Sequence, residues 1–163
     1  MSLTAAAIRG RLSIALLAVG IAGPTGPFDV PLFSTPTAPA AHGLARLVYA
    51  SSPFGVAVTA DGRARMDIRV TAAGLPAPAT LGAFKAYVAW EVSPDLSRWV
   101  RLGTVGNGTT VVGTADENKF LFVITAEPSA NPATHAGPIV LHGTSPSGWL
   151  QTFLSHPLFR GVY

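Results

Sequence analysis

The chain has 163 residues, which suffices for one domain, and 48% of them are hydrophobic while only 12% are charged. The formal net charge is +3 and the sequence contains no run of lysine or arginine, which argues against a nucleic-acid-binding surface. The absence of cysteine from the sequence excludes disulfides, thiolate metal sites and a cysteine nucleophile.

Residues 1–28 are predicted to form an N-terminal membrane anchor or signal segment. Arg9 and Arg11 precede an uncharged apolar run over residues 12–23, as in the leader of an exported protein. Twelve helical residues span about 18 Å, less than the ~30 Å hydrocarbon core, which favours a cleaved signal peptide. A helix extended to about Phe28 would instead give a short anchor, with the arginines on the cytoplasmic side. We expect the anchor and keep the cleaved leader as the alternative.

Residues 29–43 are predicted to be a proline- and alanine-rich linker. Pro31, Pro36 and Pro39 occur among small residues, a composition typical of an extended, semi-rigid polyproline II segment. The few larger apolar residues at its start, Leu32 and Phe33, are expected to rest at the membrane interface together with Phe28.

Residues 44–146 are predicted to form a β domain, because short alternating runs separated by turn residues are typical of a sandwich. The clearest run is 63–70, whose even-numbered positions are apolar and whose odd-numbered positions are charged. The run 119–127 is apolar on both faces, as in a central strand. The other predicted strands are residues 54–60, 84–92, 98–105, 109–114 and 138–142. The sequence therefore predicts an all-β fold, an antiparallel sandwich of about seven strands, preceded by a hydrophobic helix and a proline-rich linker.

Several short motifs follow one another in a fixed order along this domain. They are Gly74-Leu75-Pro76, Tyr87-Val88-Ala89-Trp90, Leu102-Gly103-Thr104, Val123-Ile124-Thr125-Ala126-Glu127-Pro128 and Pro138-Ile139-Val140. Their order, over roughly residues 45–143, resembles the extracytoplasmic domain of the anti-sigma-K factor family. The resemblance implies an immunoglobulin-like sandwich outside the membrane. That family grips its sigma factor with a cytoplasmic helical domain, and the eleven residues before the apolar run are not expected to supply one.

Residues that could carry catalysis or bind a metal show little pattern. The four histidines, His42, His135, His142 and His156, show none of the spacings typical of a metal site. A hydrolase would require two of them and a carboxylate to meet in space. Trp90 and Trp99 are expected to pack in the core. The sequence therefore predicts a non-catalytic protein without a cofactor or a metal.

Residues 147–163 are predicted to be an apolar C-terminal tail. Four of its side chains, Trp149, Leu150, Phe153 and Leu154, would lie on one side of a two-turn helix, and Phe159 extends the apolar surface. The tail could cover an edge of the β domain, or it could dock onto a membrane partner or the lipid interface.

These patterns predict a structural or accessory subunit of a bacterial membrane complex of respiratory or photosynthetic type. The expected location is the inner membrane, with the domain in the periplasm, and the alternative is an exported, soluble ligand-binding module. The residues expected to contact lipid or partner membrane subunits are Leu16, Leu17, Ile21, Phe28, Leu32, Phe33, Trp149, Leu150, Phe153, Leu154 and Phe159.

Overall fold

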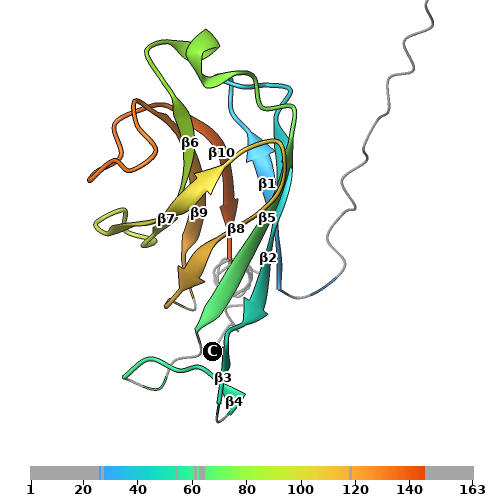
Figure 1. Ribbon diagram of the computed structural model, residues 1–163, viewed down its shortest axis with the longest axis vertical. Helices are drawn as coiled ribbons and strands as arrows, with labels where there is room; N and C mark the ends of the chain where they lie inside the picture. The colour runs from blue at the N-terminus through green and yellow to red at the C-terminus, as the bar shows by residue number, and fades with distance from the viewer. Residues whose placement is uncertain are drawn as a thin grey trace, which may run out of the picture.

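The computed structural model describes residues 26, 28–53, 55–60, 62, 65–117 and 119–145, which form β-strands and one short 3-10 helix (Figure 1). The elements are β1 (Asp29–Ser34), β2 (His42–Tyr49), β3 (Ser51–Ser52), β4 (Gly55–Val56), β5 (Met66–Ala73), η1 (Pro78–Leu81), β6 (Ala86–Val92), β7 (Trp99–Val105), β8 (Gly108–Ala115), β9 (Leu121–Glu127) and β10 (Ile139–Thr144). The all-β prediction is confirmed. In this part of the chain, no helix has the length and apolarity needed to cross a bilayer.

Eight of the strands form one large antiparallel sheet in the order β7-β6-β9-β10-β1-β2-β5-β8. Its two outermost strands, β7 and β8, follow each other in the chain and lie close together. A Cβ at Gly103 would be 2.6 Å from the carbonyl oxygen of Val112, and one at Gly113 would be 2.9 Å from that of Leu102. Glycine at both positions therefore lets the two backbones approach, and the sheet closes into a partly barrel-like shape (Figure 1).

The core lies inside this curved sheet, and the strands that line it show the predicted alternation. In β5, Ile68 and Val70 are fully buried, whereas Asp67 and Arg69 between them are exposed. β9 lies between β6 and β10 and is buried on both faces from Phe122 onward, as predicted for a central strand. Aromatic and branched side chains from all eight strands of the large sheet fill the interior, among them Val30, Ile68, Val70, Phe122, Ile124 and Leu141.

The linker predicted over residues 29–43 is corrected by the structure. Residues 29–34 form β1, whose Asp29–Leu32 segment pairs with β2 and whose last two residues, Phe33 and Ser34, pair with β10. Val30 and Leu32 are buried in the core, so the segment alternates like any strand. Pro31 lacks an amide donor, but pairing with β10 begins only two residues later. The prolines concealed this alternation in the sequence.

Candidate functional site

Both ends of the described chain lie at one end of the fold. β1 and β10 are antiparallel neighbours, with Phe33 opposite His142, so β1 begins where β10 ends (Figure 1). The β2–β5 connection, which carries the small β3–β4 hairpin, lies at this same end. We call this region the attachment end and define it by Phe28, Asp29, residues 48–53, residues 55–58 and Thr144. The apolar N-terminal and C-terminal segments of the sequence both join the domain here.

Exposed apolar side chains are concentrated at the attachment end. Of the nine large hydrophobic side chains that the described residues expose, five belong to it: Phe28, Val48, Tyr49, Val56 and Val58. The rings of Phe28 and Tyr49 meet edge to face, with centroids 5.3 Å apart, and they are 38% and 47% exposed. The attachment end therefore carries more than half of the large apolar side chains that the described residues expose.

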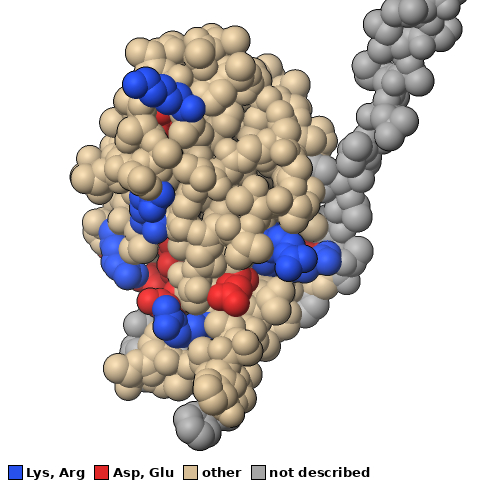
Figure 2. All heavy atoms as spheres, in the orientation of Figure 1, with Lys and Arg blue, Asp and Glu red and all other residues tan. Residues whose placement is uncertain are grey.

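Paired charges lie next to this apolar surface. The guanidinium of Arg46 donates two hydrogen bonds to the buried carboxylate of Asp29, at 2.8 and 3.0 Å, and this contact raises the pKa of Arg46. Two further ion pairs, Arg65–Asp116 and Arg98–Glu117, join strand ends on the same half of the molecule. Figure 2 shows acidic and basic side chains gathered mainly in the lower half of this face. The charges are paired with one another, so they give the attachment end little net charge.

The predicted contact residues have different positions in the structure. Phe28 belongs to the attachment end. Phe33 is 61% exposed on the outer face of β1, where its ring lies 6.3 Å from that of His142. The prediction for Leu32 is wrong, because its side chain packs in the core at 3% exposure. Outside the described residues lie Leu16, Leu17, Ile21, Trp149, Leu150, Phe153, Leu154 and Phe159.

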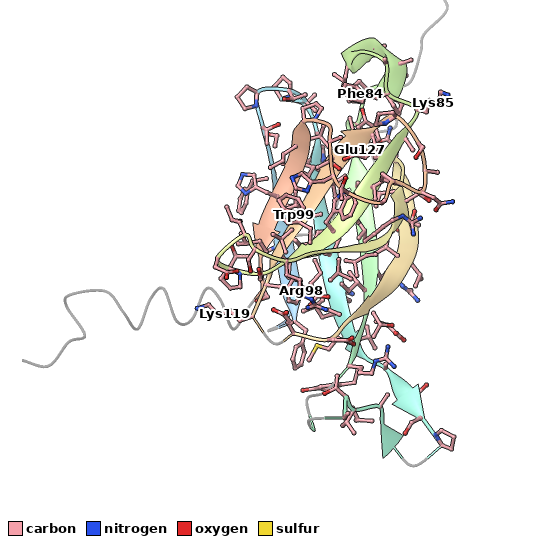
Figure 3. All side chains as sticks on the ribbon, turned by 90° about the vertical axis from the view of Figure 1, so that its left-hand side faces the viewer. Phe84, Lys85, Arg98, Trp99, Lys119 and Glu127 are labelled. Carbon is pink, nitrogen blue, oxygen red and sulfur yellow. The ribbon has the colours of Figure 1, made fainter. Side chains whose placement is uncertain are left out.

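A chain of buried polar groups crosses the outer face of β6 and β9. The indole Nε1 of Trp90 donates to Thr125 Oγ1 at 2.8 Å, and that hydroxyl donates to Glu127 Oε1 at 2.6 Å. The carboxylate of Glu127 also accepts the backbone amides of Ala136 and Gly137, at 3.2 and 3.4 Å. Trp90, Thr125 and Glu127 are all at most 1% exposed. Glu127 therefore fixes the loop of residues 128–138 to the sheet (Figure 3).

Two histidines and the buried carboxylate do not form one catalytic group in the described structure. The ring of His135 stacks on Trp99, with centroids 3.6 Å apart and planes 16° apart, while His142 lies against Phe33. Glu127 binds Thr125 and loop amides instead of an imidazole. Among the described residues, no three histidine, aspartate or glutamate side chains are grouped so that they could hold a metal ion.

No family model, curated protein or solved structure matches this chain. The likeness to the outer domain of the anti-sigma-K factors therefore stays a hypothesis based on motif order.

The role of Glu127 was missed from the sequence, although a signal for it exists. An acidic residue at the end of a run apolar on both faces must be buried, and a buried carboxylate needs hydrogen-bond donors. Glycine and small residues in the following loop, such as Gly137, let backbone amides come close enough to donate hydrogen bonds to this carboxylate. A Cβ at Gly137 would collide with the carbonyl oxygen of Ala126, so only glycine fits this approach.

A second buried carboxylate, Glu91 at the end of β6, behaves differently. Burial raises its pKa above the ordinary value of 4.5, and the amide of Glu117, which donates to it at 3.0 Å, opposes that shift. The folded chain thus holds this proton more tightly than the unfolded chain. The resulting stabilisation is complete below pH 4.5 and is lost as the pH rises through the pKa of the folded state.

Glu91→Gln is therefore expected to raise the free energy of unfolding at pH 7, because a neutral amide is buried at less cost and still accepts the Glu117 amide. The gain over the unchanged chain should shrink as the pH falls and vanish below pH 4.5. Urea unfolding at a series of pH values measures it. A variant less stable than the unchanged chain at pH 7 would contradict this account of Glu91.

Proposed function

We propose that this protein is a non-catalytic structural or accessory subunit of a bacterial membrane complex of respiratory or photosynthetic type. Its N-terminal apolar segment anchors it in the inner membrane, and its β domain lies in the periplasm. The observation that carries the proposal is that two apolar features meet at the attachment end. Both apolar terminal segments join the domain there, and five exposed large hydrophobic side chains surround the junction.

The proposal includes an immunoglobulin-like description of the domain. Strands β7, β6, β9 and β10 form one half of the sheet and β2, β5 and β8 the other, with β1 pairing to both halves. A strand shared by two packed halves is how sandwiches turn their corners. This division supports the sandwich, and the motif order supports its likeness to the outer domain of the anti-sigma-K factors.

Membrane and partner contact at the attachment end is tested with the full-length chain and two exposed-site variants. Phe28→Ser with Tyr49→Ser removes both rings of the edge-to-face pair. Val111→Ser, at a side chain that is 63% exposed on β8, is the matched control. After extraction in mild detergent, the unchanged chain and the control should migrate with partner subunits as a large species on a density gradient. The double variant should lose most of this association, about tenfold or more, while keeping its unfolding midpoint.

Three results would oppose the proposal. The unchanged chain could migrate alone as a monomer, or the control could lose association as strongly as the double variant. A water-soluble mature protein that begins near Gly23 would instead favour the periplasmic binding module.

A further inference from the structure

The end of the fold opposite to the attachment end is almost free of charge. Four connections make up this distal end: residues 35–41, 74–85, 106–107 and 128–138 (Figure 1). They contain seven prolines, and Lys85 is the one residue among them that is Asp, Glu, Lys or Arg. The charged pairs described above all lie elsewhere. Arg101 of β7 also reaches this end, where its guanidinium donates to Ala130 and Asn131.

A hollow of about 510 Å³ opens at the distal end between the β5–β6 connection, the start of β6 and the β7–β8 turn. Its walls are mainly apolar and include Leu75, Pro76, Pro78, Tyr87 and Val105, and Lys85 is its one charged lining residue. Figure 3 places Lys85 near the upper end of the molecule, beside Phe84. The volume lies within the range of ligand sites.

Side-chain hydrogen bonds hold the wall of this hollow in place. The amide of Asn107 binds both backbone groups of Leu75, accepting from the N–H at 3.0 Å and donating to the carbonyl oxygen at 2.8 Å. The hydroxyl of Tyr87 donates to the carbonyl oxygen of Pro76 at 2.9 Å. Three hydrogen bonds, two from the β7–β8 turn and one from β6, thus fix two successive residues of the wall. A wall that is already ordered loses little entropy when a ligand binds.

The ammonium group of Lys85 is available to such a ligand. Lys85 is exposed, and its side chain makes no hydrogen bond or ion pair with any residue that the structure describes. Its backbone amide donates to the carbonyl oxygen of Glu127 at 2.8 Å, so the start of the side chain is fixed at the rim. An apolar, ordered hollow with one free cation selects a ligand with an apolar body and one carboxylate.

We propose that the distal hollow binds the C-terminal end of a partner polypeptide, with its apolar last residues against Pro76 and Val105 and its carboxylate on Lys85. The hollow is partly open to solvent, so a chain end can enter while the rest of the partner stays outside. This site is separate from the attachment end. It would allow the domain to hold a second protein on the side away from its anchor.

The test uses the full-length chain in lipid nanodiscs and a fluorescein-labelled peptide, Gly-Ala-Pro-Val-Leu, with either a free carboxylate or an amide at its C-terminus. We expect the fluorescence anisotropy of the free-acid peptide to rise on binding, and we expect the peptide amide to bind about tenfold more weakly. Lys85→Gln should lower the affinity for the free-acid peptide by a similar factor. Lys119→Gln, at the charged half of the molecule, is the control and should bind like the unchanged chain.

The proposal is overturned if acid and amide bind equally, if Lys85→Gln has no effect, or if no binding is seen up to about 1 mM peptide. Displacement of the peptide by an equal concentration of octanoate would assign the hollow to a small apolar acid and not to a protein. Lys85→Gln should leave migration with membrane partners unchanged, so this test can fail without affecting the proposed role of the attachment end.

Discussion

Replacing Glu127 with alanine is expected to lower the free energy of unfolding by about 3 kcal/mol or more. The substitution removes the acceptor of the buried Thr125 hydroxyl and of the partly buried Ala136 and Gly137 amides. Each buried donor left without an acceptor costs about 1–3 kcal/mol. The empty volume at a fully buried side chain adds to the loss.

Two further variants distinguish the loss of these buried hydrogen bonds from the general effect of removing a negative charge. Glu127→Gln keeps one carbonyl oxygen at the site, so its loss should be roughly half as large. Glu117→Ala removes a partly exposed carboxylate paired with Arg98, and surface pairs of that kind contribute about 1 kcal/mol or less. Urea unfolding followed by the fluorescence of buried Trp90 measures all three. Equal losses for Glu127→Ala and Glu117→Ala would show that the buried network does not hold the loop.

The sequence predicted the strands that alternate or stand between clear turns. Residues 63–70 and 119–127 correspond to β5 and β9 because period-2 alternation and continuous apolarity are local signals. β1 was missed because Pro31 and the prolines after it are typical of linkers, and composition outweighed the buried pair Val30 and Leu32. The position of β1 between β10 and β2 depends on contacts distant in the sequence, which no local window contains.

The candidate sites were less predictable than the strands. The attachment end joins Phe28 to Tyr49 only because β1 and β2 pair in one particular register. The distal hollow depends on the side chain of Asn107 reaching the backbone of Leu75, 32 residues earlier in the chain. A hydrogen bond of this kind has no sequence period. What the sequence did provide was the short motif around Gly74, whose physical meaning is visible only in the structure.

Gly74→Ala is expected to destabilise the domain by about 3 kcal/mol, for two separable reasons. Gly74 has φ +72°, a conformation that costs an L-residue about 1–2 kcal/mol. In addition, a Cβ there would collide with the carbonyl oxygen of Ala40, which belongs to the backbone leading into β2 and cannot turn aside like a side chain. The matched control is Gly62→Ala, since Gly62 has φ +80° and open space around its Cβ position.

Gly62→Ala changes only the cost of the backbone conformation. The difference between the two variants in the free energy of urea unfolding therefore measures the cost of the contact with Ala40 alone. We expect Gly62→Ala to cost about 1 kcal/mol, leaving roughly 2 kcal/mol for the contact with Ala40. Gly74 directly precedes Leu75, so a displaced backbone there also moves the wall that Asn107 fixes. Gly74→Ala should therefore weaken peptide binding at the distal hollow under conditions where the domain is still folded. Equal losses of stability for Gly74→Ala and Gly62→Ala would show instead that the backbone around Ala40 moves to make room for the added Cβ. The wall of the hollow would then be less rigid than its hydrogen bonds indicate.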